Sequence, residues 1–413
     1  MTPSRATHRA RRPRDRSSGR LMWLAALTFA VSFSSGMTGP VFPLHAQALG
    51  ATYQQIGIVS AAGSLIHAGF ASRAGRLADR LGHDLMFLLS SLAIVFSTTA
   101  YFFSRTLFLA GLGKALDSLF IASYWPAVES ASHSSGSAAG HSLGVVYTVY
   151  PVATFAASAV TGWLAGRSGY RASFAAALLG AAAAVVGVSI GLSRSRKLDA
   201  GRDHGAARAG RRLRAHGEQP ERSAHLLPGS RLRFAAALTA CFTYCVLVGE
   251  AFTFVPLLAE ARGLRVELVG LLVGLFWLGR TATSLPAGML ADRAGADVVL
   301  VPAFVVGCMG SAAVAWSATP PVMFVGVAMM GLCAGAVAPV AMVLGAQCVD
   351  PESHGWALGL CETFCGIGFI STGLVGGVLA GRHGLAVPFA VGAAVCVTVA
   401  IGLALASRRG PSS

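Results

Sequence analysis

Long apolar runs constrain this chain most, because each is long enough to cross a lipid bilayer. A helix needs about 20 mainly apolar residues to span roughly 30 Å of hydrocarbon. Hydrophobic residues make up 54 % of the 413 positions and charged residues only 12 %, whereas soluble proteins carry roughly 25 % charged residues. The sequence therefore predicts an all-α membrane protein with twelve transmembrane helices. We expect them at residues 22–48, 54–74, 84–104, 106–130, 140–166, 169–193, 234–259, 266–288, 298–317, 320–347, 355–380 and 385–407.

A ten-residue stretch occurs twice, each time between two of these runs. GRLADRLGHD begins at Gly75 and GMLADRAGAD begins at Gly288, 213 positions later, with identity at seven of ten positions. Glycine reverses a chain without steric cost, and aspartate accepts bonds from helix-terminal N–H groups, so each copy predicts a short polar turn between two helices. The same offset relates His67 to Arg280. A fixed offset predicts two six-helix bundles in the same order, related by a pseudo-two-fold axis along the membrane normal.

The formal net charge of +15 follows the predicted loops. Of the 32 Lys and Arg residues, 24 fall in segments on one side of the predicted membrane, six in loops on the other side and two, Lys114 and Arg280, inside spans. The more basic side is the cytoplasmic one in membrane proteins. We therefore expect both termini in the cytoplasm and the chain in the inner (plasma) membrane. The distribution also accounts for the positive charge without a nucleic-acid partner.

These patterns divide the chain into five parts. The linker between the bundles carries eleven Lys and Arg with scattered Gly and Pro and no apolar periodicity, which predicts a solvated segment. We expect the N-terminal tail to be disordered. The eight cysteines all lie in the second half without metal-ligand spacing, so neither disulfides nor a metal site is expected. The parts are a basic cytoplasmic tail (1–20), an N-terminal six-helix bundle (21–193), a cytoplasmic linker (194–233), a C-terminal six-helix bundle (234–407) and a cytoplasmic tail (408–413).

The two copies of G-x-L-A-D-R-x-G resemble the signature that the major facilitator superfamily carries between helices two and three and repeats between helices eight and nine. The resemblance covers residues 22–407 and implies a twelve-helix transporter. In that family the aspartate is thought to lock the cytoplasmic gate, a role that would fall to Asp79 here. The residues implied in this gate motif are Gly75, Asp79, Arg80, Gly82, Gly288, Asp292, Arg293 and Gly295.

Ionisable side chains inside predicted spans are the first candidates for chemistry, because they cost several kcal/mol there unless they face a cavity or a partner. Lys114 and Asp117 are three residues apart and share one helix face. They either neutralise each other so that the helix inserts or form a proton or substrate site. They occupy positions where the family often carries R-x-x-Q-G, whose basic residue is linked to proton coupling. Glu250 has no charged neighbour on its own helix turn, which favours reversible protonation, or it pairs with Lys114 across the bundles. The proton-coupling candidates are therefore Asp117, Glu250 and Lys114.

A second set of residues could line a substrate cavity. Arg280 is a permanent cation that needs a carboxylate partner or an anionic ligand, and His67 occupies the equivalent position in the first half. Aromatic and Met side chains can receive apolar or cationic solutes, although every member of the set could equally serve packing. The substrate-cavity candidates are Arg280, Glu362, His67, Tyr124, Trp125, Ser34, Met37 and Tyr244.

No phosphate-binding loop, nucleophile–base pair or metal cluster is evident in the sequence. We therefore expect the protein not to be an enzyme and to need no cofactor. We expect a proton gradient to be its energy source. The resemblance implies a monomeric secondary transporter that works by alternating access, with the bilayer and a small molecule as partners. The first hypothesis is proton-coupled efflux of a drug-like or amphipathic metabolite. The second is proton symport or facilitated uptake of a polar or anionic solute, because the family's antiporter motif in helix five keeps only Gly162. A non-transporting receptor is the third.

Overall fold

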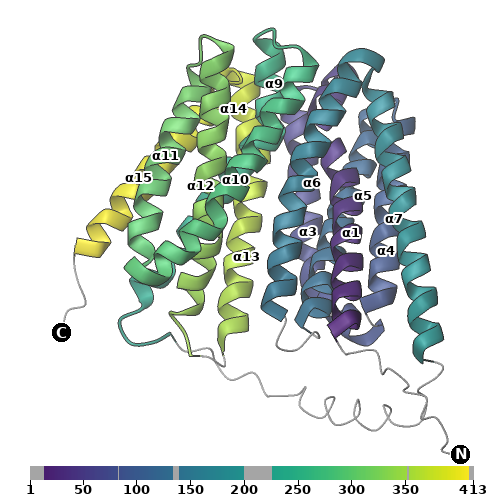
Figure 1. The fold of residues 1–413 in the computed structure, drawn as a ribbon. Coiled ribbons are helices and arrows are strands. Elements are labelled where there is room, and N and C mark those ends of the chain that lie inside the picture. Colours follow the sequence, from purple (N-terminus) through teal and green to yellow (C-terminus); the bar gives the residue numbers. More distant parts are fainter. Residues whose placement is uncertain (1–13, 82, 134–138, 200–225, 351–352, 409–413) are drawn as a thin grey trace, which may run out of the picture.

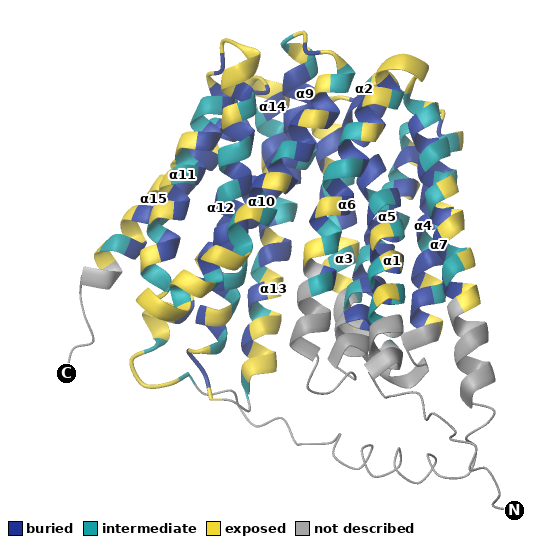
Figure 2. Ribbon diagram, in the orientation of Figure 1, coloured by how far each residue is buried: buried dark blue, intermediate teal, exposed yellow. Residues whose placement is uncertain are grey.

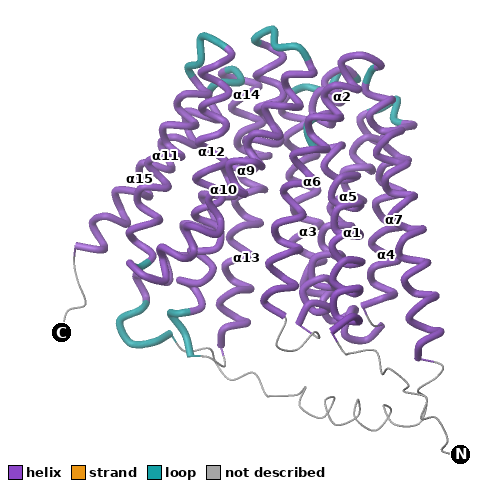
Figure 3. Tube along the Cα trace, in the orientation of Figure 1, coloured by secondary structure: helices purple, strands orange, loops and turns teal. Residues whose placement is uncertain are grey.

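The computed structural model describes residues 14–81, 83–133, 139–199, 226–350 and 353–408 (Figure 1). Within these ranges the chain is helical apart from short connections and one isolated bridge between Leu226 and Val349 (Figure 3). The helices of the first half are α1 (Arg14–Thr38), α2 (Val41–Ala48), α3 (Tyr53–Leu81), α4 (His83–Phe103), α5 (Leu107–His133), α6 (Ala139–Ser168) and α7 (Tyr170–Asp199). Those of the second half are α9 (Arg231–Ala261), α10 (Val266–Ala294), α11 (Ala296–Ala315), α12 (Pro320–Ala346), α13 (His354–Ser371), the π-helix η4 (Thr372–Gly376), α14 (Gly377–His383) and α15 (Val387–Arg408).

The predicted spans correspond to these helices one by one. The pair α1 and α2 forms the first span, and the series α13, η4 and α14 forms the eleventh. In the described part of the chain, ten spans are long and apolar enough to cross a membrane. The remaining two are α3 and α6, helices of 29 and 30 residues that pack among the others. The prediction of an all-α membrane fold is confirmed.

The packing repeats between the halves. In the first half α1 packs on α6, α3 on α5, α4 on α5 and α4 on α7. The equivalent pairs of the second half are α9 with α13, α10 with α12, α11 with α12, and α11 with α15. Buried side chains line these contacts, and exposed apolar ones cover the outer helix faces, as a lipid environment requires (Figure 2). The two halves that are related by the 213-residue offset in sequence therefore also pack their helices in the same pattern.

The repeated stretch is helical for most of its length, which corrects the expectation of a short turn. Helix α3 continues through Leu81 and α10 through Ala294, so Gly288 lies inside a helix. Only the last glycine reverses the chain: Gly295 has φ +93 and ψ 156, a conformation that a side chain would strain. Its counterpart Gly82 lies outside the described residues. The surroundings of Gly75 and the side chains of Asp79 and Arg80 are not described either. The gate role of Asp79 therefore stays a prediction.

Two further boundaries differ from the expected ones. Helix α1 begins at Arg14, so the last part of the predicted N-terminal tail is helical, and α7 extends to Asp199, inside the predicted linker. At the other end of the linker, Leu227 donates its N–H to the carbonyl of Cys348 at 3.0 Å. The charged residues at the start of α1 and at the end of α7 are compatible with a helix, because Arg and Lys have a high helix propensity.

The two halves meet through close backbone contacts at the end of the molecule away from the termini (Figure 1). Helix α3 packs against α13, η4 and α14, and α6 packs against α10 in the equivalent contact. Glycines make the approach possible: a Cβ on Gly270 of α10 would lie 2.6 Å from the Cα of Gly162 of α6, and a Cβ on Gly377 would lie 3.2 Å from the Cα of Gly57. Toward the end that carries the termini the two halves diverge (Figure 1). Residues of α10 and α13 are exposed there, including Leu285 at 72 % and Trp356 at 46 %.

We expect Gly270→Ala to destabilise this arrangement, because a methyl group so close to Gly162 forces α6 and α10 apart. Overpacking of this kind typically costs about 1–3 kcal/mol. Gly288→Ala in the same helix is the matched control, since its Cβ would meet nothing within 4 Å. Thermal unfolding of the purified protein in detergent is the measurement. Equal unfolding temperatures for the two variants would contradict the role given to the glycine contact.

Candidate functional site

A partly buried ion pair lies in the first half of α5. The Lys114 Nζ is 3.6 Å from the Asp117 Oδ2, and the side chain of Asp117 is only 5 % exposed. Ser35 of α1 donates its hydroxyl proton to the Asp117 Oδ1 at 2.8 Å. The ammonium lies 5.9 Å from the ring centre of Phe42 in α2. The missing side chain of Gly63 in α3 leaves room for the lysine, because a Cβ there would lie 3.3 Å from the Lys114 Cγ. The pair therefore joins four helices of the first half.

Glu250 lies elsewhere, inside the second half. Its residue is 2 % exposed, and the Ser311 hydroxyl of α11 donates to the Glu250 Oε2 at 3.5 Å. A Cβ on Gly392 of α15 would collide with the carboxylate, so the group is enclosed by α9, α11 and α15. The ion pairs within the described residues do not include Glu250, and Lys114 is paired with Asp117. In this conformation the alternative of a Lys114–Glu250 pair across the bundles is wrong.

A chain of aromatic rings runs from one half to the other. Trp125 of α5 meets Tyr150 of α6 with ring centres 4.9 Å apart, and Tyr150 meets Trp277 of α10 at 5.1 Å. Trp277 in turn lies 5.4 Å from Phe252 of α9. The guanidinium of Arg280 lies over the Trp277 ring at 5.2 Å. Edge-to-face pairs at these distances hold the rings in place, so the contact between the halves is ordered at this depth.

Three of the remaining substrate-cavity candidates lie near these groups. His67 is half-buried in α3 beside the backbone of Ser118. Tyr244 is 9 % exposed in α9, and its hydroxyl oxygen accepts from the Cys365 thiol at 3.6 Å. Glu362 is exposed on α13, within electrostatic reach of Tyr244. These positions are compatible with a shared site between the halves.

The other candidates serve packing in the first half. Ser34 donates to the carbonyl of Ala177 at 2.7 Å, which ties α1 to α7. Met37 is 1 % exposed and packs in the same buried cluster. Tyr124 is also 1 % exposed, and its hydroxyl is hydrogen-bonded to Thr28 at 2.8 Å. Inside the bundle, the hydroxyl groups of Ser34 and Tyr124 are hydrogen-bonded and Met37 is packed against apolar side chains. The structure therefore gives none of the three a cavity position.

Sequence reasoning missed Tyr150 and Trp277, and it chose Ser34 as a candidate instead of its neighbour Ser35. Ser35 directly follows Ser34, and the face that each presents depends on how α1 is rotated about its axis, which one chain does not reveal. Trp277 carried a usable signal, because it precedes Arg280 by three residues and therefore shares its helix face. Tyr150 lacked any local signal, since only the packing of α6 on α10 brings it to Trp277.

The cysteines form part of the packing of the second half. All eight are free thiols, and seven of them are buried. Cys241 of α9 contacts Cys361 and Cys365 of α13, one helical turn apart. Within the described ranges, three or more His, Cys, Asp or Glu side chains are nowhere arranged to hold a metal ion.

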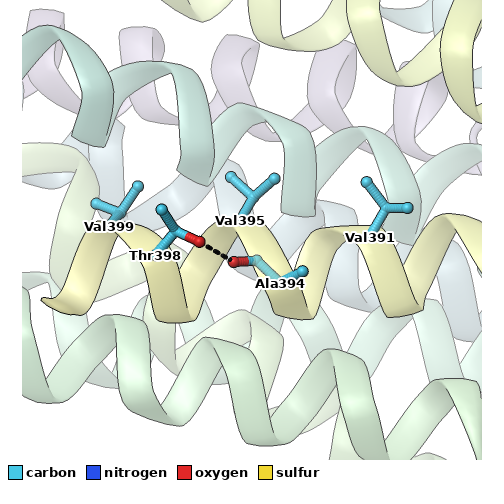
Figure 4. Close-up of a pocket in the computed structure, with 5 residues that line it drawn as sticks. All are labelled: Val391, Ala394, Val395, Thr398 and Val399. Atoms are coloured by element: carbon cyan, nitrogen blue, oxygen red, sulfur yellow. Dashed lines mark hydrogen bonds between the residues drawn. The ribbon is translucent and has the colours of Figure 1, made fainter. Parts of the chain in front are cut away.

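A shallow groove on the outer surface of α15 has none of the features of a polar binding site (Figure 4). Four of its lining residues are apolar, and the hydroxyl of the fifth, Thr398, donates to the carbonyl of Ala394 at 2.7 Å in its own helix. The groove therefore presents neither a charge nor a free hydrogen-bonding group to a polar solute.

Comparison with known proteins gives relatives of one kind. The chain matches the model of the Major Facilitator Superfamily over residues 24–268 and 234–413. It is 32 % identical over 172 residues to the multidrug resistance protein MdtG of Salmonella schwarzengrund (strain CVM19633), a match that covers 38 % of this chain and 41 % of that relative.

Solved transporters share the fold. The nucleoside transporter NupG superposes with a TM-score of 0.68 at 16 % identity, over 93 % of this chain and 98 % of that one. A POT family transporter in complex with 5-aminolevulinic acid gives 0.73 at 12 % identity, over 95 % and 96 %. A bacterial homologue of the human lysosomal transporter Spinster, in an inward-facing conformation, gives 0.67 at 13 % identity, over 95 % and 97 %. At such identities the likeness extends to the fold alone. The family model nevertheless matches nearly all of the chain, in two overlapping stretches that begin near the start of each helix bundle: this protein is a member of the major facilitator superfamily.

Proposed function

We propose that the protein is a secondary active transporter that exports a small organic molecule in exchange for protons by alternating access. The observation that carries the proposal is the pair of Lys114 with the buried Asp117, which is held by Ser35 of another helix. A transporter that runs on a proton gradient needs a titratable group whose protonation changes how its helices are held. The partial likeness to MdtG supports export of a drug-like molecule.

The arrangement of the bundles supports an alternating-access mechanism. With both termini in the cytoplasm, the end closed by the glycine contacts is the periplasmic one, so the conformation is inward-facing. Opening to the other side requires Gly57 to leave Gly373 and Gly377, and Gly162 to leave Gly270. Both contacts are backbone to backbone. Beside the second contact, Glu267 of α10 lies within electrostatic reach of Arg167 of α6, but it is only partly buried, so the two bundles separate without breaking a buried ion pair of the described residues.

The chemistry of coupling follows from what Asp117 contacts. As a carboxylate it accepts a hydrogen bond from Ser35 and pairs with Lys114, which ties α1 to α5. As a carboxylate it can also accept a hydrogen bond from a solute in the cavity, and protonation removes that acceptor together with the attraction to Lys114. Protonation and solute binding thereby compete for one group, which is the requirement for exchange. No cofactor is needed, and we propose the monomer as the working unit in the plasma membrane.

Asp117→Asn should uncouple solute movement from proton movement, because asparagine keeps the hydrogen bond from Ser35 but carries no titratable charge. In proteoliposomes with a pH gradient, we expect solute-driven proton exit to fall by about tenfold or more. Exchange of labelled for unlabelled solute should persist. The panel comprises lipophilic cations, sugars and organic acids, and Asp350→Asn, an exposed carboxylate, is the control. Wild-type proton exit in Asp117→Asn would overturn the coupling role.

Glu250→Gln should leave the ratio of protons to solute unchanged, because Glu250 faces α11 and α15 and not the contact between the halves. Glutamine can still accept the hydrogen bond of Ser311, so the bundle should fold. The measurement is the same proton flux, divided by the flux of solute in the same vesicles. Loss of proton movement in Glu250→Gln with Asp117 intact would move the coupling site into the second half.

A second candidate function is proton symport of an anionic solute into the cell. It is favoured by Arg280, which makes no ion pair with any described residue. The direction of proton movement separates the two: protons leave as solute enters during exchange, and both enter together during symport. A non-transporting receptor would retain its activity when Asp117 and Glu250 are both neutralised.

A further inference from the structure

Arg280 is a half-buried cation that forms no ion pair with a carboxylate of the described residues. The contrast with Lys114 is direct, because among the described residues Lys114 has Asp117 at 3.6 Å, whereas Arg280 has no ion-pair partner and its guanidinium lies over the face of Trp277 at 5.2 Å. A ring face attracts a cation but does not neutralise it. Arginine does not deprotonate in proteins, so the charge remains at every pH. A permanent cation without an ion-pair partner among the described residues is a place where an anion would be stabilised.

The position of Arg280 fits a ligand held between the two halves. Tyr150 of α6 lies within electrostatic reach of both Arg280 and Asp117, so the cation and the coupling pair flank the same tyrosine. Tyr244 of α9 lies within reach of Arg280 as well. An anion bound at Arg280 would thus touch both halves, which is what a transported solute must do.

A hydrogen-bond donor next to Arg280 also lacks a partner. Trp277 is 3 % exposed, and its indole Nε1 makes no hydrogen bond in the structure. Buried N–H groups almost always find an acceptor, and the indole can only donate. The indole N–H and the guanidinium belong to residues three apart on one face of α10, so a single acidic group could accept from both.

The surroundings of this donor pair are aromatic. Trp125, Tyr150, Trp277 and Phe252 follow one another with ring centres about 5 Å apart. Rings ordered in this way favour a flat apolar group over a flexible chain or a polyhydroxyl solute, because stacking and edge contacts need little rearrangement. The charged end and the apolar end of the expected ligand are therefore adjacent.

We propose that the site formed by Arg280, Trp277 and Tyr150 binds an organic anion, a carboxylate or sulfonate attached to a planar aromatic ring. The acid accepts from the guanidinium and from the indole N–H, and the ring lies among the aromatic side chains. The inference names the substrate class of the proposed transporter and rests on that function. It predicts discrimination against lipophilic cations of the same shape.

The test compares three ligands of one shape on the purified full-length protein: 2-naphthoate, 2-naphthamide and 2-naphthylmethylammonium. Binding is followed by thermal shift and by quenching of tryptophan fluorescence, neither of which needs transport. We expect naphthoate to bind at least about tenfold more tightly than the amide, and the ammonium not to bind.

Arg280→Gln should reduce naphthoate affinity by about tenfold or more and make it equal to that of the amide. Trp277→Phe keeps the ring but removes the N–H, and should reduce naphthoate affinity by a smaller factor. Arg382→Gln, an exposed arginine at the end of α14, is the matched control and should bind as the wild type does. Equal binding of acid and amide by the wild type, or unchanged naphthoate affinity in Arg280→Gln, would overturn the proposal.

Flux measurements keep this test separate from that of the transport function. If naphthoate binds through Arg280 but neither it nor any other solute moves across vesicles, the site stands and the transport proposal fails. If other solutes move with protons and Arg280→Gln changes neither their binding nor their flux, the transporter stands and the anion site fails.

Discussion

The close approach of backbones at the closed end of the molecule is the interaction on which the rest of the structure depends. Two equivalent contacts, α3 with η4 and α14, and α6 with α10, hold the halves together there. Glycine makes both possible, because the Cα of Gly162 lies where a Cβ on Gly270 would need to be. In a membrane, association of this kind relies on van der Waals packing, since lipid is as apolar as the helices themselves. The contact is therefore tight but holds no buried charge that would resist separation.

The charged groups are distributed differently between the two bundles. In the first, Lys114 and Asp117 balance each other and are tied to a neighbouring helix by Ser35. In the second, Glu250 is enclosed among α9, α11 and α15, and Arg280 rests on an indole. Burial of an ion pair is tolerable because each charge is compensated, whereas an isolated charge needs protonation or a ligand. Among the described residues, Lys114 and Asp117 thus compensate each other, whereas neither Glu250 nor Arg280 has an ion-pair partner.

Much of the fold was predictable and much of the site was not. Hydropathy and the 213-residue repeat predict twelve helices in two bundles, because a bilayer leaves few alternatives for an apolar chain. The Lys114–Asp117 contact was predictable as well, since a spacing of three residues determines it within one helix. The direction in which a side chain points from its helix was not predictable. Ser34 and Ser35 are neighbours in sequence, yet Ser34 ties α1 to α7 and Ser35 contacts Asp117. The neighbours of Glu250 and Tyr150 likewise depend on how whole helices are rotated and how they cross. Side-chain packing among several helices determines both. Helix ends were misplaced at the repeated stretch because its polar residues extend a helix as readily as they end one.

The equivalent positions His67 and Arg280 show how a duplicated scaffold becomes chemically unsymmetrical. The backbone around them repeats, with α3 on α5 in one half and α10 on α12 in the other. One position holds a side chain that can gain and lose a proton, and the other holds a charge that never changes. A symmetrical pair of bundles could respond only identically to acid and to solute. Together with the Lys114–Asp117 pair of the first half, this difference breaks the symmetry, so each inherited copy is free to specialise, one in carrying the proton and the other in recognising the cargo.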